Sequence, residues 1–305
     1  MGVSRIARKW TVCAALLTIA AGAAAQPGAI VVWGAEDPGI INVPAGTYWA
    51  ADAGSDWCAG IRADRSLIAW GSASAIPPVF NVPSGTFLQV ACGESFGVAI
   101  RTDGTLAAWG INLIGETNPP TGTFTKVDGG KHHGIGIRTN GTIAQWGNDL
   151  GSTPPLGQFL DVAAGETFSV GLRADGTLAA WGFDNGPNGQ LYPPAGQFVG
   201  VAAGLDFGAA LRADGSAVVW GNSFGNMALF TGEVRRISAS MFTLYGLRAD
   251  GTLTSNSQGS GGQPATGTFG TFGVGQFTGL AIVPAPATSL VIIAGGLITR
   301  RRRNI

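Results

Sequence analysis

Seven copies of one sequence segment follow one another along the chain, and this repetition limits the possible folds more than any other feature. A clear copy runs from Phe159 to Gly182 and reads FLDVAAGETFSVGLRADGTLAAWG. Repeats of this length are typical of propellers and solenoids, in which each copy forms one structural unit that packs against the next. The copies start 35 to 39 residues apart, at Tyr48, Phe87, Phe124, Phe159, Phe198, Val234 and Phe269.

The copies share a constant core and differ in the connectors between them. In the first five copies a Trp-Gly pair follows the start by 22 residues, and the sixth copy has Asn256 at this position. A constant core indicates packed secondary structure, whereas connectors that vary in length and carry proline pairs are expected to be surface loops. The recurring tryptophans, which we expect to pack between neighbouring units, are Trp70, Trp109, Trp146, Trp181 and Trp220.

Each core predicts about three short strands. In the fourth copy Phe168, Val170 and Leu172 alternate with smaller residues, and an apolar segment resumes after the Asp-Gly pair, which is typical of a hairpin. A three-residue hairpin loop needs a left-handed residue, and glycine recurs at that position in Gly104, Gly141, Gly176, Gly215 and Gly251. Arg65 replaces this glycine in the first copy, so we expect either about 1 kcal/mol of strain or a different turn.

The seventh copy is incomplete, and its missing part lies at the other end of the chain. Residues 269–283 match the first two strands of the repeat, but no Trp-Gly strand follows them. Residues 29–34 read AIVVWG, which is a third strand without its own repeat. We therefore predict an all-β fold, a seven-bladed β-propeller of about three-stranded blades over residues 29–283. The N-terminal strand completes the last blade and removes the exposed sheet edges.

The run VAAG, followed by LRxDGTL and AWG, resembles the repeat of the regulator of chromosome condensation family. The resemblance covers residues 29–283, and the short repeat is more similar to a compact bacterial branch that includes secreted propeller-type β-lactamase inhibitor proteins. It implies a propeller that serves as a scaffold for protein binding, exchange-factor activity or sensing. Because a fold does not define a function, the site must be argued from its own residues.

The N-terminus has the organisation of a secretory signal peptide over residues 1–25. Basic residues precede an apolar run and three alanines, which predicts cleavage between Ala25 and Gln26. We expect the mature chain to be exported, to the cell envelope or the extracellular space. Export would permit a disulfide between Cys58 and Cys92; their non-equivalent repeat positions favour two separate buried thiols.

The C-terminal segment, residues 284–305, resembles the PEP-CTERM sorting signal of exported bacterial proteins. Pro284, Ala285 and Pro286 precede a short apolar stretch over residues 290–298, and an arginine cluster follows that includes Arg300 and Arg301. Ala285 stands where that family has glutamate. A simple membrane anchor is the alternative, although the stretch is shorter than the roughly 20 residues that span a bilayer. The arginines are expected to stay cytoplasmic, and we expect membrane contact only through this tail.

Charge and residue inventory exclude several classes of function. Seven of the 18 basic residues lie in the terminal segments, so residues 26–299 carry 11 basic and 18 acidic residues, a net charge of about −7. Such a body is a poor nucleic-acid surface. The two histidines, His132 and His133, are adjacent, so a strand would point them to opposite faces. We therefore predict no metal site and no cofactor, and place His133 in the aromatic slot that Phe168 fills in the fourth copy.

Recurring charged residues are expected to be structural, because symmetric positions build a scaffold. Arginine precedes each turn at Arg62, Arg101, Arg138, Arg173, Arg212 and Arg248, where it would satisfy turn carbonyls or pair with the aspartate two residues later. Positions that differ between copies are better candidates for ligand recognition. Those that follow the recurring glycine of each copy are Asp56, Trp57, Glu94, Lys131, His132, Glu166, Leu205 and Asp206.

These features favour a non-enzymatic, monomeric binding or scaffold protein that uses one propeller face to bind a protein or a polysaccharide. Two alternatives stay open: a polysaccharide-active enzyme whose acid and base are loop carboxylates, and a secreted enzyme inhibitor. The sequence does not indicate the ligand or which face binds it.

Overall fold

The computed structural model describes residues 27–34, 42–72, 77–183, 189–221, 228–230, 233–256, 264–275 and 278–284. The predicted cleavage site between Ala25 and Gln26 lies outside the described residues. So do Ala285, Pro286, Arg300 and Arg301 of the predicted sorting tail. None of the described helices is long and apolar enough to cross a membrane.

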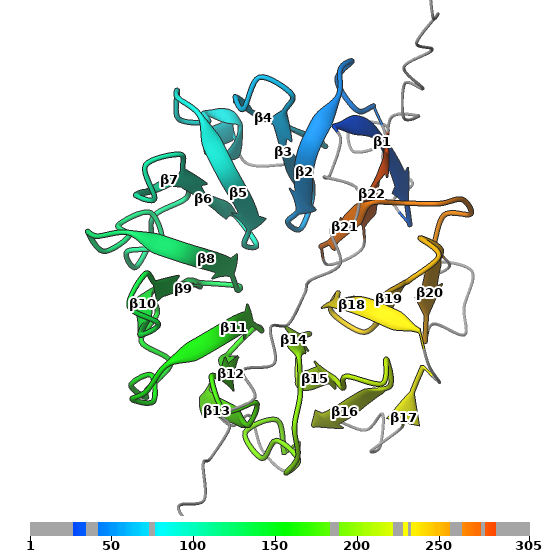
Figure 1. The fold of residues 1–305 in the computed structure, drawn as a ribbon. Helices are drawn as coiled ribbons and strands as arrows, with labels where there is room; N and C mark the ends of the chain where they lie inside the picture. The colour runs from blue at the N-terminus through cyan, green and yellow to red at the C-terminus, as the bar shows by residue number, and fades with distance from the viewer. Residues whose placement is uncertain are drawn as a thin grey trace, which may run out of the picture.

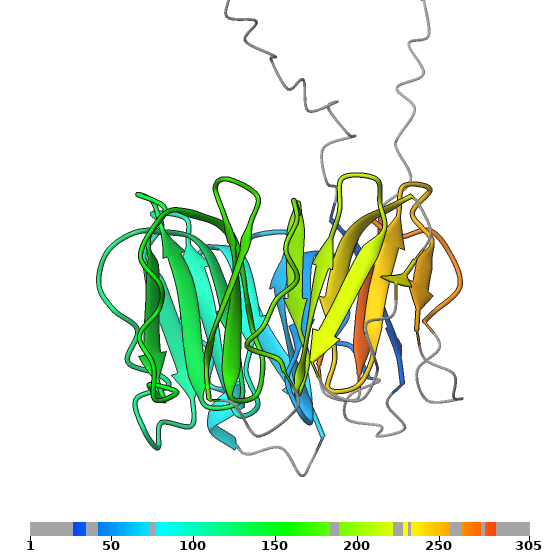
Figure 2. The ribbon, with the colours of Figure 1, turned by 90° about the horizontal axis from the view of Figure 1, so that it is seen from below.

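The described residues form short antiparallel sheets arranged radially around one axis (Figures 1 and 2). Apart from one 3-10 helix, η1 (Pro77–Phe80), every regular element is a strand, which confirms the all-β prediction. Six repeats each contribute three strands in meander order, which we call a blade. The seventh repeat contributes two strands, and its third strand comes from the N-terminal part of the chain, as described below. The blades are β2 (Tyr48–Ala53), β3 (Trp57–Arg62), β4 (Leu67–Gly71); β5 (Phe87–Cys92), β6 (Phe96–Arg101), β7 (Leu106–Gly110); β8 (Phe124–Gly129), β9 (His133–Arg138), β10 (Ile143–Gly147); β11 (Phe159–Ala164), β12 (Phe168–Arg173), β13 (Leu178–Gly182); β14 (Gly200–Ala203), β15 (Phe207–Leu211), β16 (Ala217–Gly221), with β17 (Ala228–Leu229) added; β18 (Val234–Ala239), β19 (Leu244–Arg248), β20 (Leu253–Ser255); and β21 (Thr271–Val274), β22 (Gly279–Pro284).

Strand β1 (Gly28–Trp33) is the third strand beside β21 and β22. It pairs antiparallel with β22 over its whole length, from Gly28 opposite Pro284 to Trp33 opposite Gly279. The pairing predicted between the two extremities of the repeat region is therefore present. A single further pair, Gly28 with Tyr48, links β1 to β2, so these two blades form one continuous six-stranded sheet.

In five blades the first strand begins with a side chain buried between blades. Tyr48, Phe87 and Phe159 are at most 3% exposed. A β-bulge follows this residue in five blades, because the next residue has no partner on the neighbouring strand. The bulge lets the start residue enter the core while its neighbour faces solvent.

Backbone hydrogen bonds join successive blades at the start of the first strand. The amide of Phe87 donates to the carbonyl of Arg65 at 2.9 Å, and the amide of Phe124 donates to that of Gly104 at 2.9 Å. The same bond recurs from Phe159 to Gly141, Phe198 to Gly176 and Phe269 to Gly251. Because the acceptor is the left-handed residue of the preceding turn, the constant repeat core also fixes how one blade meets the next.

Arg65 keeps the backbone of the turn that glycine forms elsewhere. Its φ is 71°, compared with 86° at Gly104, so the turn does not change form. Its guanidinium lies 4.3 Å from the ring centre of Trp49, a cation–π contact that partly offsets the strain. The recurring aspartate caps the turn: Asp103 Oδ1 accepts from the amide of Thr105 at 2.9 Å and from its hydroxyl at 2.7 Å.

The recurring arginines and tryptophans are structural, as predicted, but the arginine bonds a carbonyl of the preceding connector and not one of its own turn. Arg101 donates to the carbonyl of Ser84 at 2.8 Å and stacks over Phe87, so it satisfies a connector carbonyl. Trp109 is buried and donates to the carbonyl of Val79 at 2.9 Å. Cys58 and Cys92 are buried, unpaired thiols, as favoured above, and burial raises the pKa of each.

Replacing Gly104 with alanine should lower the free energy of unfolding by about 1 kcal/mol, because an L-residue is strained at this φ. The new Cβ would also lie 3.2 Å from Cβ of Thr123. Urea unfolding of Gly104→Ala against the parent chain measures the effect. Arg65→Gly is the matched control and should change stability by less than about 0.5 kcal/mol, since relief of strain offsets the lost stacking. A Gly104→Ala chain as stable as the parent would show that the turn does not need a left-handed glycine.

Candidate functional site

The strand pairing gives the disc of blades two distinct faces. The first strand of each blade starts beside the Arg-x-Asp-Gly turn and ends at the recurring glycine, as Tyr48 opposite Arg62 and Ala53 opposite Cys58 illustrate. We call the side that carries the Arg-x-Asp-Gly turns the turn face. The opposite side, which carries the loops after Gly54, Gly93, Gly130, Gly165 and Gly204, is the glycine face.

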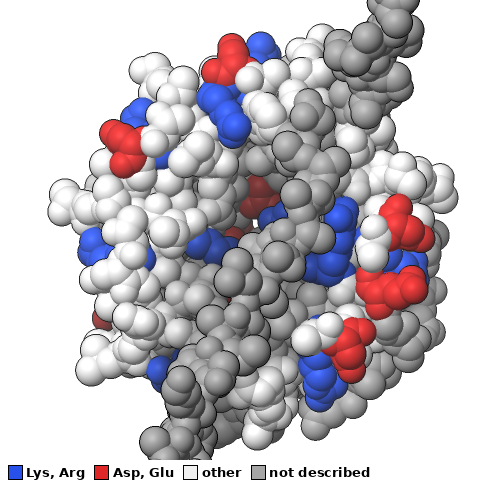
Figure 3. Space-filling model, viewed as in Figure 1, with Lys and Arg blue, Asp and Glu red and all other residues white. Residues whose placement is uncertain are grey.

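A channel runs along the axis between these faces, and the first strands of the blades line it. Its main part is a cavity of about 530 Å³ bordered by β2, β5, β8, β11, β14, β18 and β21. A smaller cavity of about 100 Å³ forms its mouth at the glycine face. Viewed along the axis, basic and acidic side chains occur together in the opening and around the outer rim (Figure 3).

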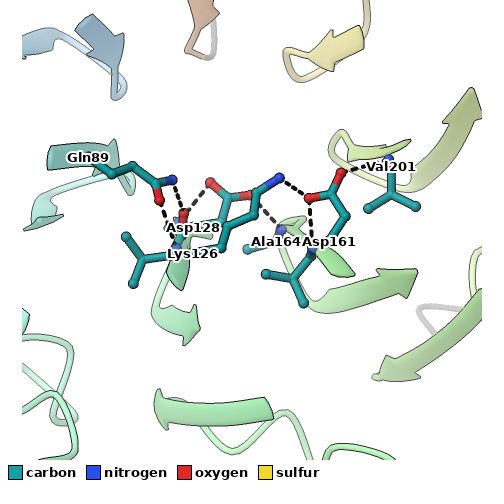
Figure 4. Close-up of polar contacts among 9 residues, drawn as sticks. Gln89, Lys126, Asp128, Asp161, Ala164 and Val201 are labelled. Atoms are coloured by element: carbon teal, nitrogen blue, oxygen red, sulfur yellow. Dashed lines mark hydrogen bonds and ion pairs between the residues drawn. The ribbon is translucent and has the colours of Figure 1, made fainter. Parts of the chain in front are cut away.

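Polar side chains that line the channel join neighbouring blades. Asp161 accepts from Lys126 in the preceding blade and from the amide of Val201 in the following blade, the latter at 3.2 Å (Figure 4). Gln89 donates to the carbonyl of Val127 at 2.8 Å and accepts from its amide at 3.3 Å.

Two further aspartates make the same kind of link deeper in the channel. Asp52 Oδ2 accepts from the amide of Cys92 at 2.9 Å, and Asp128 Oδ2 accepts from the amide of Ala164 at 2.8 Å. Each bond joins a carboxyl group of one blade to the backbone of the next. The polar channel residues therefore hold the blades in register around the axis.

These channel residues were not among the binding residues predicted from the sequence. A signal for them exists, since charged or amide side chains interrupt the otherwise apolar first strand two or four residues after its start. Gln89, Lys126, Asp161 and Arg236 lie two residues after the start of their repeats, and Asp52 and Asp128 lie four residues after it. The signal becomes meaningful only when the first strand of each blade is known to line the axis, where these side chains meet.

Burial in the channel raises the pKa of two carboxyls, Asp52 and Asp128. Burial, together with the nearby charge of Asp128, raises the pKa of Asp52 to about 8, despite the amide of Cys92. Burial also raises the pKa of Asp128. A protonated carboxyl can still accept the amide hydrogen bond through its carbonyl oxygen.

The mouth at the glycine face brings together four of the predicted binding residues. Glu94, Lys131 and Glu166 border it, and Lys131 Nζ lies 2.5 Å from Glu166 Oε1, which raises the pKa of Lys131. His132 Nε2 lies 3.9 Å from Glu94 Oε2, and its Nδ1 lies 3.8 Å from Glu116 Oε1. The result is a mixed-charge cluster of partly exposed side chains on three neighbouring blades, Glu94, Lys131, His132 and Glu166, which we call the mouth cluster.

The other predicted binding residues lie elsewhere. Trp57 is 2% exposed, and its indole donates to the carbonyl of Glu94 at 3.1 Å, so it is a core residue that supports the mouth and cannot contact a ligand. Asp56 is exposed and Asp206 half-buried; both belong to glycine-face loops but do not border the mouth, whereas Leu205 does. Phe242 is an exposed apolar residue of the same face that the sequence analysis missed.

His133 occupies the aromatic slot, as predicted. It is fully buried beneath Gly130, as Phe168 is beneath Gly165, and its Nε2 lies 2.9 Å from Ser169 Oγ of the next blade. Burial lowers the pKa of His133 to about 4, so the ring is neutral at pH 7. Among the described residues, no three His, Cys, Asp or Glu side chains are placed to hold a metal ion together.

Comparison with known proteins identifies one repeat and the fold. Residues 87–113 match the model of the Regulator of chromosome condensation (RCC1) repeat. No curated protein sequence matches the chain. The chain therefore contains a repeat of the RCC1 type, as the resemblance implied.

Solved structures extend the likeness from one repeat to the whole fold. Human WBSCR16 is 16% identical over 84% of this chain and all of its own length, with a TM-score of 0.69. Prp20p from Saccharomyces cerevisiae, described with its binding to Gsp1p and histones, is 13% identical over 86% of this chain and 93% of its own, with a TM-score of 0.68. The ectodomain of receptor kinase CR4 from Physcomitrella patens is 19% identical over 74% of this chain and 67% of its own, with a TM-score of 0.63. At these identities the likeness establishes an RCC1-like propeller fold.

Asp52→Asn should stabilise the chain increasingly as the pH rises. Because the pKa of Asp52 is raised on folding from 3.8 to about 8, its contribution to stability is fully present below pH 4 and is lost as the pH rises to 8. Asparagine stays neutral and keeps an acceptor for the amide of Cys92. Urea unfolding at pH 5, 7 and 9 measures the free energy of unfolding of both chains. The difference in favour of the variant should grow with pH by about a few kcal/mol at most, because each unit of pKa shift corresponds to about 1.4 kcal/mol.

The control for this series is Asp103→Asn, since asparagine occurs naturally at the equivalent position 140. The neighbouring Thr105 lowers the pKa of Asp103 on folding, so its titration lies below pH 4 and its effect should be constant from pH 5 to 9. A stability difference between Asp52→Asn and the parent that does not change with pH would contradict the raised pKa of Asp52.

Proposed function

We propose that this chain is an exported, non-enzymatic binding protein of the cell envelope, built as a closed seven-bladed propeller. The proposed ring consists of the blades that start with β2, β5, β8, β11, β14 and β18, together with the unit of β21, β22 and β1. The β1–β22 pairing supports closure, because it leaves no unpaired strand between the first and last repeats. Export and the PEP-CTERM-like tail rest on the terminal sequences.

The glycine face is the proposed binding surface, and the partner we propose is a protein. The observation that carries this assignment is the combination of the mouth cluster with exposed apolar side chains on the same face. Leu113, Ile114 and Phe183 follow third strands that end there, and Phe242 lies in the loop before β19. Apolar and aromatic anchors next to charged groups that can pair across an interface are typical of protein-binding surfaces.

The structural neighbours support a protein partner without identifying it. One neighbour, Prp20p or yeast RCC1, is described with its binding to Gsp1p and histones and in a complex with Kap60. Those partners belong to that protein. The acidic body of this chain favours an envelope partner with complementary basic groups, because opposite charges accelerate association and select between partners.

A double variant, Glu166→Lys with Phe242→Ser, should abolish capture of the partner protein from solubilised envelope. It changes the mouth cluster from net acidic to net basic, which would repel a basic partner, and it removes an aromatic anchor. Each change costs an interface on the order of tenfold or more in affinity. Pull-down with immobilised chain and identification of the retained proteins by mass spectrometry provides the measurement.

The matched control is Leu156→Ser with Val199→Ser, which changes two exposed apolar residues of the turn face. The control should retain the partner. Retention by the glycine-face variant, or loss only in the control, would contradict the assignment of the face. Capture of polysaccharide alone would replace the protein partner by the carbohydrate alternative.

A further inference from the structure

The turn face is where the described chain begins and ends. Gly28 pairs with Pro284, and Gly28 also pairs with Tyr48, which lies opposite Arg62 at the turn-face end of its blade. Val283 and Pro284 are both exposed. Pro284, the last described residue, therefore lies at the turn face, and the C-terminal segment is attached there.

The spacing in the sequence places any membrane attached to that segment close to the turn face. Five residues separate Pro284 from Leu290, where the apolar stretch begins. A fully extended chain covers at most about 3.6 Å per residue, so the stretch starts within about 22 Å of Pro284. The glycine face lies farther away by the length of a strand, about 20 Å for six residues. A tail this short brings the turn face to the membrane before the glycine face.

The turn face exposes apolar side chains around the channel opening. Leu156 is 93% exposed, Leu160 64%, Val199 56% and Leu88 51%. Leu88 and Leu160 are bulge residues, so the backbone itself turns their side chains outward. Exposed apolar groups next to one another on a face mark an interaction surface.

The distribution of charge also distinguishes the two faces. Each Arg-x-Asp-Gly turn carries its own arginine, and the turn face adds Arg65 and the exposed Arg235, so basic groups balance or exceed the acidic turn residues there. The glycine face carries Asp56, Glu94 and Glu166 against Lys131 as its one lysine or arginine among the described residues of those loops. An anionic bilayer repels the acidic glycine face, whereas the basic groups of the turn face allow that face to approach it.

We propose that the turn face lies against an anionic lipid bilayer, with Leu88, Leu156, Leu160 and Val199 in the interfacial region. This proposal rests on the envelope location in the proposed function and on the membrane contact that the sequence predicts for the C-terminal tail. It adds a second contact beyond the tail and sets an orientation, in which the glycine face and its mouth cluster point away from the bilayer. The apolar side chains enter the interface between head groups and acyl chains, as those of peripheral membrane proteins do.

Site-directed spin labelling tests the orientation directly. The native thiols Cys58 and Cys92 are buried, so a label reports one introduced cysteine: Leu156→Cys on the turn face or Leu113→Cys on the glycine face. The chain of residues 26–305 is reconstituted with vesicles of phosphatidylcholine and phosphatidylglycerol, and flotation separates bound from free protein. Power saturation then compares accessibility to oxygen, which enters lipid, with accessibility to a water-soluble nickel complex.

The proposal expects the label at position 156 to shift towards oxygen when the chain floats with vesicles, while the label at position 113 stays accessible to nickel. A chain that floats with position 156 accessible to nickel refutes the orientation and leaves the anchoring intact. A label at 156 shielded from both reagents contradicts the proposal by showing that protein covers this face. A chain that does not float refutes the predicted membrane contact of the tail and this proposal with it, whereas the proposed protein binding at the glycine face is tested separately by the pull-down.

Discussion

The antiparallel pairing of β1 with β22 is the interaction on which the rest of the architecture depends. Each of the other blades is made by one continuous repeat, but this blade joins segments from opposite ends of the repeat region. Without β1, the edge of β22 would be unpaired, and Trp33 would leave the core it shares with Tyr245. Because the ends that meet there both lie at the turn face, the same pairing also decides where the terminal segments leave the molecule.

A second set of interactions positions the blades around the axis, and it uses unlike residues at like positions. Amide-to-turn bonds such as Phe87 to Arg65 recur with the repeat, whereas the channel links use Asp52, Gln89, Asp128 or Asp161. Burial raises the pKa of two of these carboxyls, so the links combine hydrogen bonding with a cost at high pH. Because the channel residues bond to neighbouring blades, we assign them a structural role. The mouth cluster is therefore the candidate binding site.

The sequence predicted most of the scaffold because the scaffold is periodic. The strands, the turn arginines, the His133 slot and the β1–β22 pairing follow from positions that recur or fail to recur. The site was less predictable. Glu94, Lys131, His132 and Glu166 were found because they vary after a constant glycine, but the same criterion selected Trp57, which is in the core. The channel residues and Phe242 depend on which side chains meet in space, and a one-dimensional repeat does not contain that information.

Native-state hydrogen exchange of β1 tests the central pairing most directly, since amides in a strand that completes a cooperative blade exchange only when the blade opens. The account predicts that amides of residues 29–33 are as protected as those at the equivalent positions of β7 (Leu106–Gly110), the third strand of another blade, which also has one fully paired neighbour. Rapid exchange of β1, at the rate of an unstructured terminus, while β7 stays protected, would contradict the pairing and the ring built on it.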